Sequence, residues 1–253
     1  MSKRHEAIGI KQVVRLEWYD YALDMLLNER PAKEIRVELD AFIRERQQAG
    51  GYGERGAQTY VKAVTQIMNA WVTPSPDLVS FRNVALASAR HMSRDVRIVH
   101  HWAVTIAAYP FWHRVAEQVG RLLNLQESVT QGQIRLRCFE AMGERSTVER
   151  SARRVIRTFV AWEALRDSTN KGCYERSSPI HVTDPKLATL LLEAALHATP
   201  EARAGLPSLL HSPAFFAFDL PVLSGDFIAQ NNDRVDVGRY GLDDTLLQLK
   251  GTS

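Results

Sequence analysis

The sequence has few of the residues and motifs that mark several common protein classes. It contains two cysteines, Cys138 and Cys173, and they do not have CxxC spacing. This excludes a cysteine-based zinc site and a disulfide scaffold, and it suits a reducing cytoplasm. The sequence also has no GxxxxGKS/T loop, no GxGxxG after an expected strand, no HExxH and no GxSxG. These are motifs of common nucleotide-binding sites, metalloproteases and hydrolases, so no cofactor is expected.

Long hydrophobic runs are absent as well. The first residues, MSKRHEAIGIKQ, include basic residues but no apolar segment of a secretory signal. The most apolar stretch, Trp102 to Trp112, has about half the residues that a membrane span of ~20 needs, and it contains Pro110. It predicts a buried helix and its end. With 45% hydrophobic and 24% charged residues, the chain is expected to be cytoplasmic and globular, without membrane contact.

Charge is nearly balanced in total but not along the chain. The net charge is +3, and 25 of the 32 basic residues are Arg, whose planar fork of donors suits phosphate. Residues 1–125 sum to +4, residues 126–183 to +3 and residues 184–253 to −4. Residues 131–158 alone carry seven Arg and three Glu. An acidic C-terminal part therefore masks a basic body, which indicates a polyanionic partner.

Hydrophobic periodicity and turn residues divide the chain into three expected domains of a mainly α fold. Residues 1–125 are expected to form a helical bundle, residues 126–183 a winged helix-turn-helix, and residues 184–253 a small α+β element. Outside the middle domain, helices are expected over 11–29, 31–47, 55–72, 77–90, 94–109, 111–125 and 185–198, and strands at 234–238 and 245–249. A glycine-rich run at 49–53 separates the second helix from the third.

The middle domain begins with two helices. The first is expected over 131–142 and is followed by a Gly-Glu-Arg turn at 143–145. The second is expected from 147 to about 165, with Ser146 as its N-cap and Glu149 completing a capping box.

Two short β-like runs follow these helices, at 173–175 and 180–182, with a Ser-Ser-Pro turn between them. We expect the runs to pair as a hairpin. Helix, turn, helix and hairpin is the order of a winged helix-turn-helix, in which the hairpin is the wing.

The second helix of this domain has one apolar and one basic face. When residues 147–160 are advanced by about 100° per residue, five apolar side chains fall on one arc, the width of a core-facing stripe. They are Val148, Ala152, Val155, Ile156 and Phe159. The opposite arc carries Arg150, Arg153, Arg154 and Arg157. Like charges at neighbouring helix positions repel, and a surface helix with a purely structural role would normally carry Glu among them. The unmixed basic face therefore predicts a binding surface for duplex DNA.

Residues around this helix complete the expected DNA surface. Backbone N–H groups at a helix N-terminus favour phosphate, and arginines on the preceding helix and cations on the wing can reach the flanking DNA backbone. The candidate DNA-binding residues are Arg135, Arg137, Arg145, Ser146, Thr147, Arg150, Arg153, Arg154, Arg157, Lys171 and Arg176.

Other interpretations remain open for these features. Winged helices also bind proteins, and acidic residues of the C-terminal part could fold back onto the basic helix. The carboxylates concerned are Asp233, Asp236, Asp243 and Asp244. With Asp226 they could also suggest a nuclease metal site, but they lie in turn-rich sequence. His91, His100, His101 and His113 have no metal-ligand spacing, so neither a metal site nor an enzyme is expected.

The order of several segments resembles one bacterial family. The run HHWAVTIAAYPFW at 100–112 is followed by GRLLNLQ at 120–126 and by GERSTVERSARRVIRTF at 143–159. This order resembles BrxA, the DUF1819 family of bacterial BREX phage-defence systems, over roughly residues 10–220. The resemblance implies a small helical protein, similar to the RNA-binding factor NusB, that binds DNA and has no catalytic motif.

The resemblance also implies partners and an alternative site. Other BREX proteins would be its partners, and the oligomeric state is left undefined. A NusB-like fold would place the nucleic-acid site on the N-terminal bundle, where Arg82, Arg90, Arg94 and Arg97 form a second basic set. An RNA-binding or protein-interaction adaptor of the same complex is therefore the alternative to DNA binding.

Overall fold

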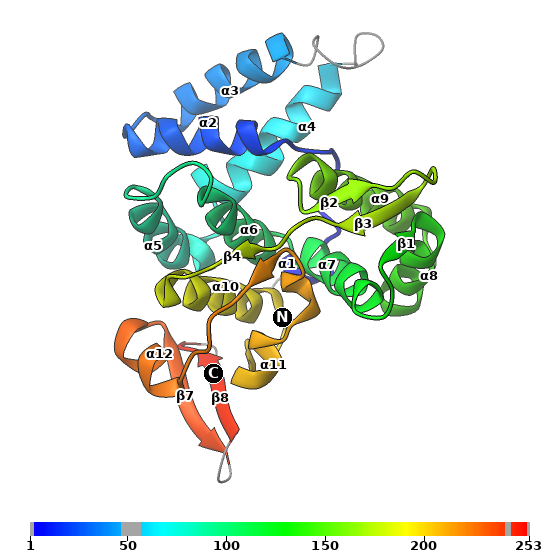
Figure 1. The fold of residues 1–253 in the computed structure, drawn as a ribbon. Helices are drawn as coiled ribbons and strands as arrows, with labels where there is room; N and C mark the ends of the chain where they lie inside the picture. The colour runs from blue at the N-terminus through cyan, green and yellow to red at the C-terminus, as the bar shows by residue number, and fades with distance from the viewer. Residues whose placement is uncertain (1–2, 47–56, 241–243, 252–253) are drawn as a thin grey trace.

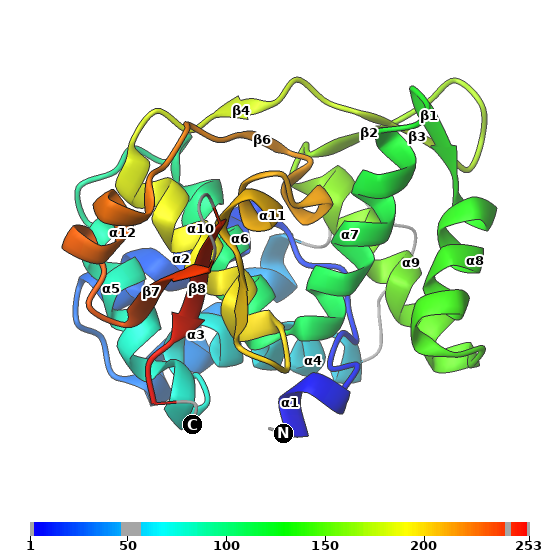
Figure 2. The same cartoon turned by 90° about the horizontal axis from the view of Figure 1, so that it is seen from below.

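The computed structural model describes residues 3–46, 57–240 and 244–251 of the chain. It confirms a mainly α fold in which three small sheets lie outside the helical core (Figures 1 and 2). Helices α2 to α4 form one end of the molecule in Figure 1, and the C-terminal hairpin forms the opposite end. The glycine-rich break expected at 49–53 lies outside the described residues.

The described chain contains the following elements. The helical segments are α1 (Lys3–Glu6), α2 (Leu16–Leu27), α3 (Ala32–Arg46), α4 (Ala57–Ile67), η2 (Met68–Val72), η3 (Pro76–Leu78), α5 (Val79–Ala89), α6 (Arg97–Ala108), α7 (Pro110–Leu123), α8 (Gln131–Met142), α9 (Ser146–Ala161), α10 (Pro185–Ala198), α11 (Leu206–Leu210), η4 (Pro213–Phe215) and α12 (Gly225–Asn231). The strands are β1 (Ser128–Thr130), β2 (Leu165–Asp167), β3 (Cys173–Arg176), β4 (Ile180–His181), β5 (Arg203–Gly205), β6 (Phe218–Asp219), β7 (Val235–Tyr240) and β8 (Asp244–Leu249).

The helix expected over 11–29 begins later than predicted, at Leu16. The preceding residues are not helical: the chain bends at Gln12, and Arg15 is extended, with φ −98° and ψ 153°. Ile10 and Val14 are both buried, and their spacing of four residues fits one face of a helix as well as one side of an extended chain. Because both periods match, the sequence pattern could not separate the two.

Helix α6 lies in the centre of the apolar core. Its residues from Ile98 to Ala107 are all buried, and it packs against α10. Pro110 then begins α7, where a proline is tolerated because the first N–H groups of a helix have no partner within the helix. The apolar stretch 102–112 is therefore a buried helix and a break, as predicted. In the part of the chain that the structure describes, we find no helix with the length and hydropathy of a membrane span.

The second half of the chain contains the same order of elements twice. In residues 110–176, which we call the central module, the order is α7–β1–α8–α9–β2–β3, and the antiparallel sheet has the order β1–β3–β2. In residues 185–249, the C-terminal module, the order is α10–β5–α11–η4–β6–α12–β7–β8, and the antiparallel sheet has the order β5–β8–β7. The inserted elements are η4, which packs on α7, and β6, which pairs with β4 outside this sheet. With these two elements set apart, each module is helix–strand–helix–helix–hairpin, with the last strand in the middle of its sheet.

The predicted hairpin of the middle domain is wrong in its strands. The structure pairs β2 with β3, whereas the run at 180–182 pairs in parallel with β6. The turn from Ser168 to Gly172 closes the hairpin because Gly172 takes a φ of +78°, which glycine adopts without strain. The predicted helix extends to about residue 165, but α9 ends at Ala161 and Glu163 has a φ of +57°.

Candidate nucleic-acid interface

Helix α9 is held in the protein by the apolar face that the sequence predicts. Val148, Ala152, Val155, Ile156 and Phe159 are all buried. The Phe159 ring lies among aromatic neighbours, with its centroid 4.7 Å from that of Trp112 and 5.2 Å from that of Trp102. This packing fixes the rotation of α9, so the opposite face is directed outward.

The outward face of α9 carries the four predicted arginines. Arg150 and Arg153 are exposed, and Arg154 and Arg157 are half-buried. The Arg150 Nε–H donates to the Ser146 carbonyl at 3.3 Å. Burial and the charges of Arg150 and Arg153 lower the pKa of Arg154. Three guanidinium groups therefore repel one another on this face, and an approaching polyanion would relieve that repulsion.

Arg157 differs from the other three because it has a carboxylate partner. Its Nη1 donates to Asp167 Oδ1 at 2.5 Å. Burial alone would lower the pKa of Arg157, but the hydrogen bonds and charges of Asp167 and Tyr174 hold the pKa above its ordinary value. Because Asp167 is in β2 and Tyr174 in β3, this arginine connects the basic face of α9 to the hairpin.

The N-terminus of α9 is not capped as predicted. The helix begins at Ser146 with Arg145 in the N-cap position, and no side chain caps it. Arg145 has the extended backbone of an N-cap residue, so the Ser146 hydroxyl lies one residue too late to bond the N3 amide. Ser146 and Thr147 are exposed, so this uncapped turn lies at the surface. The capping box occurs instead at α8, between Thr130 and Gln133.

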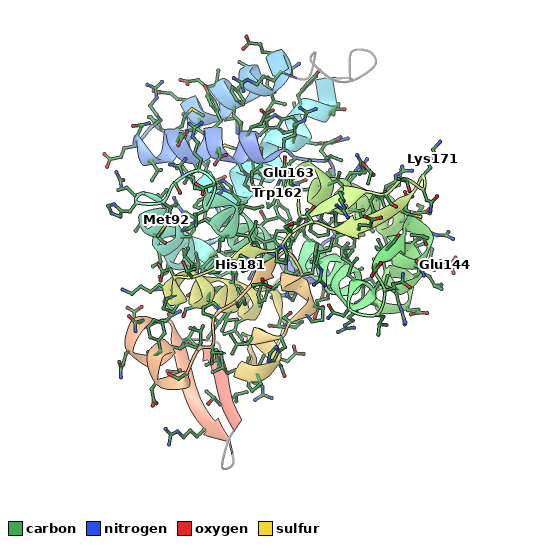
Figure 3. The ribbon with its side chains drawn as sticks, in the orientation of Figure 1. Met92, Glu144, Trp162, Glu163, Lys171 and His181 are labelled. Carbon is green, nitrogen blue, oxygen red and sulfur yellow. The ribbon has the colours of Figure 1, made fainter. Side chains whose placement is uncertain are left out.

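The hairpin tip carries Lys171, which is exposed. Figure 3 shows Lys171 and Glu144, a residue of the α8–α9 turn, at the same outer edge of the molecule. The ion pair between Arg166 Nη2 and Glu175 Oε2, at 2.8 Å, joins the two hairpin strands. The hairpin tip lies beside the first turn of α8, where the Gln131 N–H donates to the Gly172 carbonyl at 2.8 Å. The beginning of α9 follows the other end of that 12-residue helix, so a partner that contacts both must span about 18 Å.

Two of the candidate DNA-binding residues, Arg176 and Arg137, lie away from the outward face of α9. Arg176 is at the base of the hairpin, where its Nη2 donates to Asn124 Oδ1 at 2.8 Å. Arg137 pairs with Glu140 at 3.2 Å and lines an open cavity of about 360 Å³ beside Asn124. These two arginines gather at the end of α7. Arg176 is thus in the β2–β3 hairpin and Arg137 in the helix before α9, as predicted, but each is held by a polar partner of the protein.

The other predicted cations are exposed on the α8 side of α9. The Arg135 guanidinium lies over the Phe139 ring, 5.5 Å from its centroid. Arg145 is exposed, and its Nη2 donates to the Met142 carbonyl at 3.0 Å. Each guanidinium group thus makes one contact with the protein, and its other N–H groups are available to a ligand.

The second basic set, on the N-terminal bundle, is partly paired. Arg94 and Arg97 both pair with Asp24, at 2.6 and 2.5 Å. Arg82 is half-buried, and burial lowers its pKa. Arg90 is exposed. This set offers a phosphate fewer unshared charges than the outward face of α9 does.

The C-terminal carboxylates form ion pairs within their own module. Asp226 pairs with Arg239 at 3.7 Å, Asp233 with Arg234 at 3.1 Å and Asp236 with Lys250 at 3.7 Å. Asp243 and the side chain of Asp244 lie outside the described residues. Across 3–46, 57–240 and 244–251, no three His, Cys, Asp or Glu side chains are placed to hold a metal ion.

Sequence reasoning missed two cations that lie close to α9. Lys11 and Arg15 were assigned to the first helix of the bundle, but they belong to the extended segment that precedes α2. The alternation of buried Ile10 and Val14 with exposed Lys11 and Arg15 was the available signal.

Comparison of the chain with protein-family models, with curated proteins and with solved structures found no match.

Proposed function

We propose that the chain is a non-enzymatic protein that binds duplex DNA through α9 and the β2–β3 hairpin. The observation that carries the proposal is the outward face of α9, on which Arg150, Arg153 and Arg154 have no carboxylate partner within the described chain. The order of elements and the sheet order β1–β3–β2 support a winged helix-turn-helix. Helix α9 would then be the recognition helix and the hairpin the wing.

The size of α9 favours duplex DNA over duplex RNA. A helix with its side chains is about 10–12 Å wide, which matches the major groove of B-DNA at about 12 Å. The major groove of A-form RNA is deep and too narrow for such a helix. An arginine face on a rigid helix therefore fits DNA best.

Most of the affinity would come from phosphate contacts. Guanidinium groups bind phosphate with two parallel hydrogen bonds, and they also reach the O6 and N7 atoms of guanine. The uncapped first turn of α9 adds backbone N–H groups. We expect binding that tolerates many sequences and that weakens steeply with salt.

The biological setting is proposed from the resemblance to BrxA. Residues 100–112, 120–126 and 143–159 carry that resemblance, and the last of these segments contains the basic face of α9. We propose that the chain is the DNA-binding component of a BREX-type phage-defence complex and that other BREX proteins are its partners.

The experiment is a fluorescence-anisotropy titration of a labelled 20-bp duplex with the intact chain. The variant Arg150→Ala/Arg153→Ala/Arg154→Ala should bind about 100-fold more weakly at low salt. The salt dependence, d log K/d log[salt], should become shallower by about 2.7, because each phosphate contact contributes about 0.9. The matched control removes three exposed cations elsewhere, in Lys33→Ala/Arg36→Ala/Arg203→Ala, and should bind as the unchanged protein does.

Two results would contradict the proposal. One is unchanged affinity of the triple arginine variant, which would remove α9 as the site. The other is a preference for structured RNA when unlabelled RNA and duplex DNA compete for the protein, which would favour the RNA-binding adaptor.

A further inference from the structure

We propose that the extended segment Ile10–Arg15, which we call the N-terminal strap, forms a second track of the same DNA surface. The strap borders the arginine face of α9 and presents Lys11 and Arg15 to the DNA backbone beside the groove that α9 enters. This inference rests on the proposed function and adds a second segment of the chain to it.

The strap is fixed to α9 by three hydrogen bonds. The Ser151 hydroxyl donates to the Ile10 carbonyl at 2.8 Å. The Val14 N–H donates to the Thr158 hydroxyl oxygen at 3.3 Å, and the Trp162 Nε1–H donates to the Val14 carbonyl at 3.2 Å. Figure 3 shows Trp162 and Glu163 at the end of α9 that lies opposite the hairpin tip. The strap therefore runs along α9 from Ser151 to Trp162, in the direction of the helix.

These contacts place the strap at the edge of the basic face. Ser151 and Thr158 are seven residues apart, so they lie two turns from each other on the same side of α9. Arg154 is between them in sequence and is rotated from Thr158 by only about 40°. The strap consequently covers the side of α9 that adjoins Arg154, which is why Arg154 is half-buried while Arg150 and Arg153 are exposed.

The backbone of the strap sends its cations outward. In an extended chain, successive side chains point to opposite sides. Ile10 and Val14 are buried to 1% and 0% exposure, whereas Lys11 and Arg15 are exposed. Gly9 permits this course, since it has a φ of +66° and a Cβ there would lie 2.8 Å from the Tyr109 ring. The Lys11 N–H also donates to Gln66 Oε1 at 3.4 Å, which anchors the strap on its other side.

The charges of the strap are available to a polyanion. Lys11 makes no ion pair with the residues that the structure describes, and Arg15 makes one long ion pair, in which its Nη1 lies 3.9 Å from Oε1 of the solvent-exposed Glu17 carboxylate. Lys11 and Arg15 are four residues apart, and the chain bends at Gln12 between them. A DNA strand presents a phosphate for each ~3.4 Å of helix axis, so the two cations can neutralise two different phosphates. Because the strap is already ordered, binding costs it little conformational entropy.

The test measures the affinity of the intact chain for the same 20-bp duplex between about 50 and 300 mM salt, the range over which phosphate contacts dominate. Lys11→Ala/Arg15→Ala should weaken binding about tenfold at the lowest salt and make the salt dependence shallower by about 1.8. Lys11→Arg/Arg15→Lys should restore both values, because it keeps the charges while changing the side chains. The control Lys33→Ala/Arg36→Ala removes one exposed lysine and one exposed arginine from α3, and it should change neither value.

The outcome separates this inference from the proposed function. If the strap variant binds with the affinity and salt dependence of the unchanged protein while the triple α9 variant loses binding, the strap inference is wrong and the proposed function stands. If neither variant changes binding, the proposed function is wrong as well. A fall in the thermal midpoint of Lys11→Ala/Arg15→Ala, without restoration by the charge-preserving variant, would assign the strap a structural role only.

Discussion

The central and C-terminal modules share an order of elements but present opposite surfaces. In the central module the third helix, α9, has 16 residues and four arginines on its outward face. In the C-terminal module the third helix, α12, has seven residues, and its single charged side chain is Asp226. The residues from 184 onward carry a charge of −4. The shared topology therefore does not imply a shared ligand, because binding depends on the residues of the exposed face.

The modules also differ in how their second and third helices pack. Helices α8 and α9 contact each other directly. Between α11, α12 and the β7–β8 hairpin there is an open cavity of about 540 Å³, lined by Leu206, Leu210, Leu223 and Val237 among others. Gly225, at the start of α12, lies so close to the hairpin that a Cβ would be 2.8 Å from Thr245 Cγ2. Helix α12 thus packs on the hairpin, which leaves the space toward α11 open.

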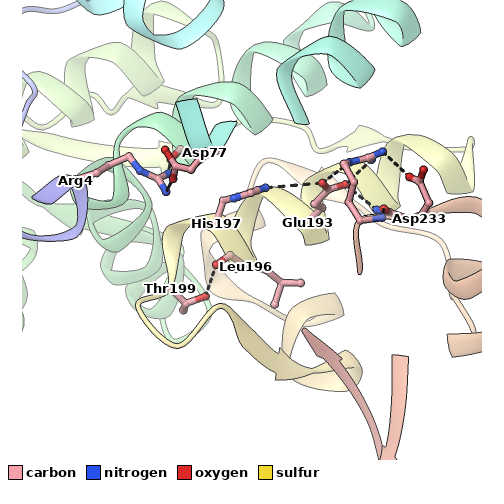
Figure 4. A network of polar contacts seen from close by, with 10 residues as sticks. Arg4, Asp77, Glu193, Leu196, His197, Thr199 and Asp233 are labelled. Atoms are coloured by element: carbon pink, nitrogen blue, oxygen red, sulfur yellow. Dashed lines mark hydrogen bonds and ion pairs between the residues drawn. The ribbon is translucent and has the colours of Figure 1, made fainter. Parts of the chain in front are cut away.

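A buried ion pair connects the C-terminal hairpin to its first helix. Arg234, just before β7, donates through Nε and Nη2 to the two carboxylate oxygens of Glu193 in α10, at 2.7 and 2.8 Å. Asn232 Nδ2 donates to the same carboxylate at 2.7 Å, and His197 lies 3.8 Å from it. Figure 4 shows this network beside the exposed carboxylate of Asp233. The central module, by contrast, joins its hairpin to its third helix through Arg157 and Asp167 near the surface.

The largest effect on stability is expected from Glu193→Gln. Its side chain is fully buried, and removing one member of a buried ion pair leaves the other charge uncompensated, at a cost of about 3–5 kcal/mol. The control Asp233→Asn, which removes a carboxylate that is 91% exposed and pairs with the same arginine, should change the free energy of unfolding by less than about 0.5 kcal/mol. Urea unfolding at pH 7 measures both values.

The pH dependence of the stability lost in Glu193→Gln provides a second check of the ion pair. Burial alone would raise the pKa of Glu193, but hydrogen bonds from His197, Arg234 and Asn232 and the charge of Arg234 hold the pKa below its ordinary value. A lowered carboxyl pKa in the folded state stabilises the protein above the pKa of the unfolded chain, and this stabilisation is lost as the pH falls. The deficit of Glu193→Gln should therefore shrink below about pH 4.3. A deficit that stays constant with pH would contradict the charged network.

A smaller loss of stability is expected at the joint between the modules. Helix α7 of the central module packs on η4 of the C-terminal module, and a Cβ at Gly120 would meet the Pro213 carbonyl oxygen. That oxygen belongs to the backbone and cannot move aside as a side chain does. We expect Gly120→Ala to destabilise the protein by about 2–3 kcal/mol, a typical cost of overpacking.

The matched control for this joint is Gly132→Ala. Gly132 is also in a helix, but its nearest neighbour to an added Cβ is the Thr130 hydroxyl at 3.8 Å, so alanine should stabilise α8 by about 0.5–1 kcal/mol. Thermal unfolding of both variants tests the difference. Equal effects of the two substitutions would show that the modules are not held together at Gly120.

The long elements of the fold could be predicted because local signals mark their ends. Helix α8 has the predicted bounds, since it is followed by Gly143, which takes a φ of +85°. Helix α10 begins at Pro185 and ends at Ala198, as predicted, with Asp184 as its N-cap. The apolar face of α9 followed directly from residue spacing. In each case the determining residues lie within a few positions of the element.

The expected strands at 234–238 and 245–249 are confirmed as β7 and β8, but the other short strands, the sheet pairings and the repeat could not be predicted from local signals. Strand β1 has three residues and β4 has two, too few to show an alternating pattern. Helices α11 and α12 are likewise too short to show helical periodicity. The pairing of β3 with β1 joins residues more than 40 positions apart, although its pairing with β2 is a local hairpin. The strap was missed for a related reason, because its contacts with α9 join residues 10–14 to residues 151–162.

The smallest expected effect tests whether only the central module meets DNA. Glu144 and Glu149 are at the start of α9, so Glu144→Gln/Glu149→Gln should strengthen binding to the 20-bp duplex by about three- to tenfold at 0.15 M salt, because repulsion of nearby phosphates is removed.

Asp226→Asn/Asp233→Asn/Asp236→Asn removes three negative charges from the C-terminal module instead. Interactions beyond a Debye length of about 8 Å are screened at this salt concentration. Carboxylates that do not lie against DNA should therefore change its affinity by less than about twofold. A gain as large as that of the α9 variant would place the C-terminal module on the DNA as well. In that case both modules would contact the same DNA, and the negative charge of the C-terminal module would weaken its binding.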